Sequence, residues 1–284
     1  MPEIPEIQAH AERLADSFTG RVLTGFRPIT FTALKTATPA PDEAYSRPLR
    51  RVGRRGKYIL LEFEPVTFVV HLMQGGRLLP DTKLSAKPRG GQARFLFDGD
   101  ADGDPPALLL TEAGTERRAG VWCVPTDGAL GAPPLDVLGP EAAEVDPEEL
   151  LGILGRKNQR IHGFLRDQRS IAGIGRRLAN EICHRAQLSP FAMTGKFDLD
   201  QATRLVDAIR ACVDEGVAYE RERTDMSSSK DRPSAVHGRT GEPCPVCGDA
   251  VRAVEYSGYT VHYCATCQTG GKVLADNTTS RFLR

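Results

Sequence analysis

Four of the seven cysteines form two closely spaced pairs near the end of the chain. Cys244 and Cys247 make one Cys-x-x-Cys pair, Cys264 and Cys267 make the other, and sixteen residues separate the pairs. Thiolates at this spacing converge on one tetrahedral ion, and four thiolates are a usual ligand set for structural zinc. The alternative, disulfide bonds, is disfavoured in a reducing compartment. We expect one structural Zn²⁺ ion, which stabilises a hairpin too short to bury a core.

The N-terminal residues Pro2 and Glu3 offer a different chemistry. If Met1 is removed, Pro2 presents a secondary amine with a pKa of about 8. Such an amine can attack the anomeric carbon of a deoxyribose and form an iminium intermediate. Glu3 and Glu6 lie near enough in sequence to donate and accept protons. The alternative, which composition alone favours, is that Pro2 only begins a helix.

Basic residues are concentrated in two segments, although the net charge of the chain is zero. Residues 1–150 carry 17 basic and 22 acidic side chains, and residues 151–284 carry 20 and 15. Positions 47–57 hold six basic residues and no acidic one, and positions 156–177 hold seven with one acidic residue. A solvated surface explains either segment alone. Together the segments favour a surface that binds phosphates.

A glycine-containing turn lies within the second basic segment. It runs from Gln168 to Gly175 and is followed by Arg176 at a predicted helix start. Glycines allow backbone amides to approach an anion, and the helix dipole favours a phosphate there. A Gly-x-Gly turn alone has little specificity, but the neighbouring arginines make it a candidate clamp for a nucleic-acid backbone.

The composition is that of an ordinary soluble protein, and we expect it in the cytoplasm. No apolar run approaches the roughly 20 residues that span a bilayer, and the N-terminus lacks the basic start and apolar core of a secretory signal. The remaining cysteines lie in apolar surroundings and are expected in the core. They are Cys123, Cys183 and Cys212.

The spacing of apolar residues predicts strands in the first half of the chain and helices after it. Residues 1–16 read as a helix, and short apolar runs from about 20 to 125 predict a two-layered β-sandwich. The expected strands are 21–26, 58–63, 67–72, 94–97, 107–111 and 120–124. After a loop at 125–140 the period becomes helical, with N-terminal capping signals at Asp146 and Asp198. Helices are expected at 158–167 and 176–187 as well, and the zinc segment reads as a β-hairpin that turns at Ser257-Gly258.

Several motifs, taken in order, resemble one family. They are Pro2-Glu3-Ile4-Pro5-Glu6, Arg54-Arg55-Gly56-Lys57-Tyr58, His71-Leu72, Gln168 to Gly175 with Asn180-Glu181, and Gly238 to Cys244. Over about residues 1–268 the chain resembles the formamidopyrimidine-DNA glycosylase and endonuclease VIII family, as a divergent bacterial member. The motifs at the two ends are the most specific.

The resemblance implies an α+β multidomain protein that binds damaged double-stranded DNA between its domains. We expect a catalytic β-sandwich domain at 1–135, a helix–two-turn–helix domain at 136–225, and a zinc finger with a basic tail at 226–284. Family members flip a damaged base out of the duplex, release it and nick the strand by β- and δ-elimination. By position, Pro2 is the nucleophile, Glu3 the acid that assists sugar-ring opening, Lys57 a phosphate contact that assists elimination, and His71 a backbone contact. Gripping an extruded nucleotide requires several cations, which fits this set.

The chain departs from the family at two phosphate positions. Arg176 stands where the family usually has an asparagine, and Tyr259 stands where the zinc hairpin usually offers an arginine. An arginine can make the first contact with added charge, whereas a neutral phenol is a weaker phosphate partner. We keep both residues as expected DNA contacts.

The positions that fill the vacated base site also differ. Gln74 replaces the usual methionine, with Met73 beside it, and Ala119 replaces a common phenylalanine wedge. Alanine cannot stack in the gap, so Met73 or Arg117 is expected to fill it.

The leading hypothesis is a monomeric, nucleoid-associated base-excision repair glycosylase with AP lyase activity on oxidised bases. The altered positions motivate an alternative, a non-catalytic or altered-specificity binder of damaged or structured nucleic acid that retains the fold. A zinc-ribbon interaction module leaves the N-terminal motif unexplained. The sequence does not choose the lesion or assign a role to the tail at 268–284.

Overall fold

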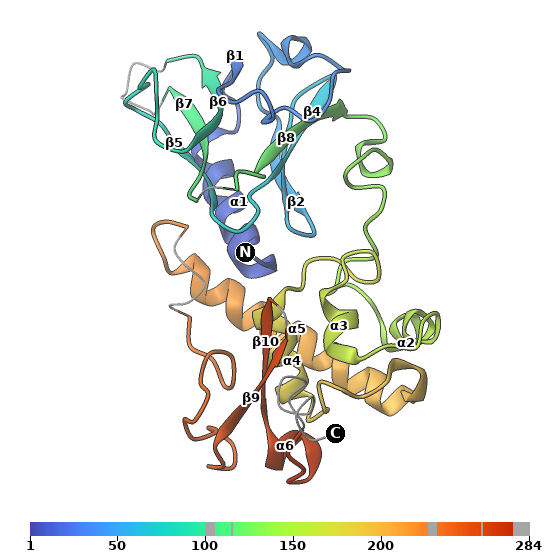
Figure 1. Ribbon diagram of the computed structural model, residues 1–284. Coiled ribbons are helices and arrows are strands. Elements are labelled where there is room, and N and C mark those ends of the chain that lie inside the picture. The colour runs from blue at the N-terminus through green and yellow to red at the C-terminus, as the bar shows by residue number, and fades with distance from the viewer. Residues whose placement is uncertain (100–105, 115, 227–231, 257, 275–284) are drawn as a thin grey trace. The chain divides into compact units, whose positions relative to one another are not determined.

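A computed structural model describes residues 1–99, 106–114, 116–226, 232–256 and 258–274. The chain folds into two compact units, which Figure 1 colours along the sequence. The first comprises Met1–Leu138 and Glu220–Ser227, and the second comprises Gly139–Tyr219 and Ser228–Arg284. Within the described ranges, no helix is both long and apolar enough to cross a membrane. The three-part domain division stays a prediction.

The first unit is built on two four-stranded antiparallel sheets. One has the order β1-β6-β7-β5, with β1 Leu23–Pro28, β6 Gly91–Phe97, β7 Ala107–Glu112 and β5 Gly76–Pro80. The other has the order β2-β3-β4-β8, with β2 Arg51–Arg55, β3 Tyr58–Glu62, β4 Val66–His71 and β8 Gly120–Pro125. Phe68 of the second sheet lies 5.5 Å from Phe26 and 5.2 Å from Phe95 of the first, between ring centroids. The core therefore lies between the sheets, and the predicted sandwich is confirmed.

Two strands of this unit were not predicted from the sequence pattern. Strand β2 consists of Arg51-Val-Gly-Arg-Arg55, so only Val52 provides an apolar side chain. Strand β5 begins with glycine and ends with proline, two residues that usually interrupt strands. Each is held by pairing with an apolar neighbour, β3 or β7.

Helix α1 (Ile4–Phe18, blue in Figure 1) packs along the second sheet. Its apolar face buries Ile7, Leu14 and Phe18 in the core of the first unit. Arg54 of β2 donates from Nε to Gln8 Oε1 at 2.8 Å, which ties the β2–β3 hairpin to this helix. The helix thus fixes the position of the N-terminal residues relative to the basic hairpin.

The second unit begins with helices, two of which have the N-terminal caps expected from Asp146 and Asp198. They are α2 Pro147–Gly155, α3 Ile161–Arg166, α4 Arg176–Arg185 and α5 Leu199–Arg221. The side chain of Asp146 accepts a hydrogen bond from the amide of Glu149 at 2.7 Å. Asp198 Oδ1 accepts from the amide of Gln201 at 2.8 Å, and Gln201 Oε1 accepts from the amide of Asp198 at 3.2 Å. Single 3₁₀ turns occupy Pro41–Ala44 and Ala129–Gly131 in the first unit and Thr194–Lys196 in the second.

The predicted zinc hairpin is present in the second unit. It consists of β9 (Val251–Tyr256) and β10 (Tyr259–Cys264), with Val254 opposite Val261, and is followed by α6 (Ala265–Thr269). The turn contains Gly258 at φ +85°, a conformation that favours glycine. Ser257 and the part of the predicted basic tail from 275 onward lie outside the described residues.

Candidate functional site

The four predicted metal ligands meet at one point. The sulfur atoms of Cys244, Cys247, Cys264 and Cys267 all lie within 4.8 Å of one another. The Cys247–Cys264 and Cys244–Cys267 sulfurs are 3.3 and 3.9 Å apart, and none of these cysteines forms a disulfide. Four thiolates bound at about 2.3 Å to a tetrahedral zinc ion are about 3.8 Å apart. The donor set and its spacing therefore fit one structural Zn²⁺ ion, as expected.

Helix α4 supports this zinc centre with a histidine that the sequence analysis did not single out. His184 is 5% exposed, and its Nε2 lies 3.3 Å from Cys244 Sγ. A hydrogen bond from a ring nitrogen to a ligand thiolate orients the ligand and moderates its charge. Gln268 adds a second link, because its side chain accepts from the amide of Cys264 at 2.8 Å and donates to the carbonyl of Leu188 at 3.0 Å.

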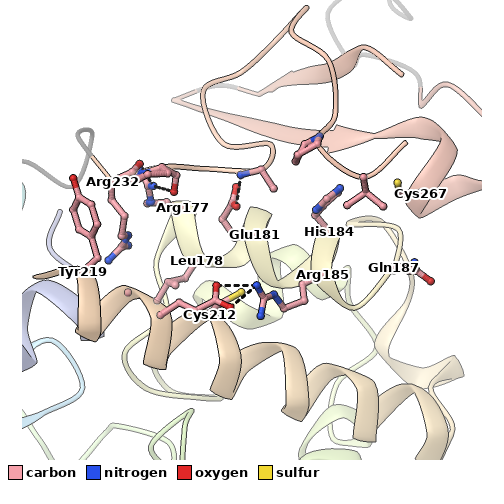
Figure 2. A pocket seen from close by; sticks show the side chains of 16 residues that line it. Arg177, Leu178, Glu181, His184, Arg185, Gln187, Cys212, Tyr219, Arg232 and Cys267 are labelled. Atoms are coloured by element: carbon pink, nitrogen blue, oxygen red, sulfur yellow. Dashed lines mark hydrogen bonds and ion pairs between the residues drawn. The ribbon is translucent and has the colours of Figure 1, made fainter. Parts of the chain in front are cut away.

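A cavity of about 530 Å³ lies beside this support, between α4, α5 and the loops that lead to the zinc knuckle (Figure 2). On one side, Glu181 accepts hydrogen bonds from the backbone amides of residues 235–237 at 2.7–3.1 Å. Arg177 donates to the carbonyls of Arg232 and Pro233. On the α5 side, Arg185 pairs with Glu215. Glu181 and Arg177 thus hold the loop that leads to the zinc knuckle against α4, whereas Arg185 and Glu215 join α4 to α5.

The predicted nucleophile and acid lie at the start of α1. Pro2 is buried, Glu3 is 4% exposed, and Met1 is 48% exposed. The backbone amide of Glu3 donates to Glu6 Oε2 at 2.8 Å, which caps the helix. This hydrogen bond fixes the backbone of Glu3 at the helix start, and Glu6 has a structural role in addition to any proton transfer.

Lys57 and His71 lie in the same unit and influence each other. Lys57 occupies the β2–β3 turn, 6% exposed, and Tyr58 pairs across the sheet with His71 at 4.5 Å between ring centroids. Burial lowers the pKa of His71 to about 4, and the charge of Lys57 contributes. The Nδ1 atom of His71 accepts from the amide of Met73 at 3.2 Å, so the proton resides on Nε2. A neutral Nε2–H donor beside a lysine suits a phosphate oxygen.

The residues expected near the vacated base site are divided between surface and core. Arg117 and Gln74 are exposed, and Met73 adopts a positive φ of 51°. Ala119 is 1% exposed, and its amide donates to Glu112 Oε2 at 2.6 Å. Arg117 and Met73 are the two residues expected to fill the vacated base site. Arg117 is exposed and Met73 is half-buried.

The glycine turn before α4 is organised by Gln168. Its Oε1 accepts from the amide of Gly173 at 2.9 Å, and its Nε2 donates to the carbonyl of Ile174 at 2.8 Å. Gly173 has φ +101°, so this turn requires glycine at that position. Because the amide of Gly173 already donates to Gln168, an anion at this turn would have to be bound by the residues that follow. Arg176, the first residue of α4, is exposed and donates to the carbonyl of Gly258 at 3.1 Å.

Tyr259 lies at the tip of the zinc hairpin among aromatic rings. Its ring stacks on Tyr256 at 4.9 Å and lies parallel to His162 of α3 at 6.1 Å. The guanidinium carbon of Arg166 is 4.1 Å from the centroid of Tyr259. The structure thus brings Tyr259 and Arg176 together at the hairpin tip. Pro2, Glu3, Lys57, His71 and Arg117 belong to the other unit.

A buried asparagine fastens the hairpin to α4. Asn180 is fully buried, and its Nδ2 lies 2.8 Å from His237 Nδ1 and 3.3 Å from His262 Nδ1. Its Oδ1 accepts from the amide of His262 at 3.3 Å. Asn180 and Glu181 appear in the sequence motif, but only their partners in the zinc module reveal that both serve to position it.

Comparison with known proteins places these features in one family. Residues 1–108 match the formamidopyrimidine-DNA glycosylase N-terminal domain, and residues 241–270 match the zinc finger found in FPG and IleRS. A formamidopyrimidine-DNA glycosylase of Chloroflexus aurantiacus is 30% identical over 284 residues, covering 94% of this chain and 98% of the relative. The chain belongs to the formamidopyrimidine-DNA glycosylase family.

Other similar proteins match different shares of the chain. An uncharacterized formamidopyrimidine-DNA glycosylase-like protein of Mycobacterium tuberculosis is 43% identical over 162 residues, which is 54% of this chain and 99% of that protein. The crystal structure of MutM (Fpg) from Thermus thermophilus is 27% identical, with a TM-score of 0.78 over 96% of this chain and 100% of that chain. The Lactococcus lactis enzyme bound to DNA with an AP site has a TM-score of 0.81 at 20% identity, over 94% and 99% of the chains, and shows the shared family fold.

Proposed function

We propose that this protein is a base-excision repair DNA glycosylase that also cleaves the strand at the resulting abasic site. The observation that carries the proposal is that Pro2 and Glu3, at the capped start of α1, belong to the same compact unit as Lys57 and His71. Family membership supports it, since relatives are named formamidopyrimidine-DNA glycosylases. Solved relatives hold DNA with an AP site or 8-oxo-G.

The proposed chemistry begins with the Pro2 amine, after removal of Met1. Its lone pair forms a bond to C1′ of the damaged nucleotide while the bond from C1′ to the base breaks, and the proton that the amine loses passes to the departing base. Glu3 donates a proton to the ring oxygen, which opens the sugar and leaves an iminium at C1′. The iminium acidifies the neighbouring C2′ protons, so loss of the 3′ and then the 5′ phosphate follows by β- and δ-elimination. Water finally releases the sugar fragment and restores the amine.

The remaining residues bind the nucleic acid in this proposal. Lys57 holds a phosphate of the flipped nucleotide and His71 donates from Nε2 to the adjoining backbone. Arg117 reaches toward the space the base leaves, while Arg176 and the hairpin tip contact the strand from the second unit. Zinc fixes the hairpin in its folded form. We further propose that the protein acts as a monomer in the cytoplasm, on nucleoid DNA.

Borohydride trapping tests the proposal directly. The protein is incubated with duplexes carrying 8-oxoguanine, an oxidised pyrimidine or an abasic site, and covalent adducts are resolved by electrophoresis. We expect a reducible adduct with the wild type, none with Pro2→Gly, and an intact mass that lacks Met1. Absence of an adduct on all three duplexes would overturn the enzymatic proposal. Tight lesion binding in that case, unaffected by Pro2→Gly, would favour the non-catalytic binder instead.

A further inference from the structure

The tip of the zinc hairpin holds an arginine from a different element. Arg166, the last residue of α3, lies with its guanidinium carbon 4.1 Å from the centroid of Tyr259. Tyr259 is itself fixed by parallel stacking on Tyr256 at 4.9 Å and by His162 at 6.1 Å. His162 is 2% exposed, so this stack is anchored in the interior of the unit.

A second arginine lies at the same tip. Arg176 donates to the carbonyl of Gly258, the residue that precedes Tyr259. Neither Arg166 nor Arg176 forms an ion pair with any carboxylate in the described part of the chain. The nearest acid in sequence, Asp167, accepts hydrogen bonds from the amide of Arg169 and the hydroxyl of Ser170.

The geometry leaves the two cations suited to an anion. A guanidinium that stacks on a ring uses its face, and its N–H donors lie in its plane, where they remain available to acceptors. Stacking also restricts a long side chain before any ligand arrives, which lowers the entropic cost of binding. Two guanidinium groups without carboxylate partners therefore favour a ligand with several anionic oxygens, and bidentate contact with phosphate is the usual outcome.

We propose that Arg166 and Arg176 together clamp a phosphodiester of the DNA backbone, and that Tyr259 is the positioning residue that holds Arg166 in place. This inference rests on the proposed function. It assigns the charge at the hairpin tip to α3 and α4 rather than to the hairpin itself. Tyr259 acts through its ring, so its hydroxyl is dispensable.

Binding measurements with a duplex that carries a tetrahydrofuran abasic analogue test the clamp. We expect Arg166→Ala to weaken binding about tenfold and to reduce the slope of log K against log salt by about 0.9, the value for one lost phosphate contact. Tyr259→Leu should produce a similar loss, whereas Tyr259→Phe should bind like the wild type. The loss in Arg166→Ala/Tyr259→Leu should be close to that of either single variant, because both changes remove the same contact.

A charge swap and a matched control sharpen the result. Arg166→Ala/Tyr259→Arg returns a cation to the hairpin tip and should recover most of the affinity. Arg169→Ala removes an exposed arginine three residues away that has no ring contact in the described structure, and should cost less than Arg166→Ala. Zinc content and thermal unfolding confirm that each variant is folded, and Arg166→Gln, which keeps most of the aliphatic stem, replaces Arg166→Ala if that variant is not.

Two outcomes separate this inference from the proposed function. If the wild type binds and cleaves lesion DNA, and Arg166→Ala matches it in affinity and salt dependence, the clamp is wrong and the proposed function stands. Equal losses in Arg166→Ala and Arg169→Ala would also overturn it, because charge alone would then suffice. If the wild type neither binds the duplex nor forms an adduct, the proposed function itself fails.

Discussion

The Nε2 atom of His184 lies 3.3 Å from the Sγ atom of Cys244, so α4 contacts a zinc ligand directly. The structural zinc centre is therefore coupled to the helix that also carries Arg176 at its first position. The metal site and the surface that we propose binds the DNA backbone therefore share one supporting helix.

Loss of the His184 imidazole nitrogens should weaken metal binding without abolishing it. We expect His184→Phe to lower the zinc affinity by about 10- to 100-fold, the range for removal of a hydrogen-bonded partner of a metal ligand. Competition with a chromogenic chelator measures the change. His184→Gln keeps a side-chain amide N–H near the sulfur and should lose less. An unchanged affinity in His184→Phe would show that the contact does not tune the site.

Removal of a zinc ligand should impair the hairpin tip and spare the first unit. Cys247→Ala is expected to bind no zinc at equimolar metal and to lose DNA affinity by more than tenfold, because the metal supplies the folding free energy of the hairpin. Metal analysis and binding assays provide the measurements. Cys212→Ser, a half-buried thiol outside the centre, is the matched control and should retain one zinc ion. Full DNA affinity in Cys247→Ala would contradict the prediction.

Neutralising Glu3 should affect catalysis and leave the helix intact. In Glu3→Gln the backbone amide of residue 3 still donates to Glu6, so α1 keeps its cap. We expect the rate of base release to fall by about 10²- to 10⁴-fold, as is usual for loss of a general acid. Single-turnover assays on a lesion duplex measure that rate. A wild-type rate would remove Glu3 from the mechanism.

The stability of the first unit should fall on acidification. His10 is 3% exposed, Nε2 lies 2.7 Å from the carbonyl of Leu78, and burial lowers its pKa from 6.5 to about 4. In the unfolded chain His10 therefore becomes protonated near pH 6.5, whereas in the folded chain it becomes protonated only near pH 4. Stability is fully present above pH 6.5 and declines between these values, by roughly 3 kcal/mol at most.

Urea unfolding at several pH values between 7.5 and 4.5 tests this assignment. His10→Gln removes the titrating group, so its free energy of unfolding should depend less steeply on pH in this range. The variant is expected to be less stable than the wild type at pH 7.5. If both proteins show the same pH slope, then His10 does not contribute to it.

The sequence predicted those elements whose signals are local. Paired cysteines and alternating apolar residues specify the zinc hairpin, and capping residues mark the starts of α2 and α5. Strand β2 was not predicted because its arginines are typical of a solvated surface. In the structure, pairing with β3 and packing on α1 hold it in a sheet.

The arrangement of the site depends on contacts between distant residues, which no local pattern encodes. From the sequence we interpreted Tyr259 as a weakened phosphate contact. Only the folded chain shows that Arg166, 93 positions earlier, places a cation over the ring of Tyr259. The roles of His184 and Asn180 were hidden for the same reason, since their partners lie in the zinc module. Pro2, Glu3, Lys57 and His71 were identified from motifs, and their chemical roles stay predictions.

The first unit includes residues from two separate stretches of the chain. Arg13 donates to the carbonyl of Glu220, Arg221 pairs with Glu12, and Met226 packs in the sandwich core. A ribosome that has made residues 1–138 has therefore not yet supplied everything this unit requires. The sandwich reaches its final form only after α5 has been synthesised, so a nascent chain stalled before residue 220 would expose an incomplete core to chaperones and proteases.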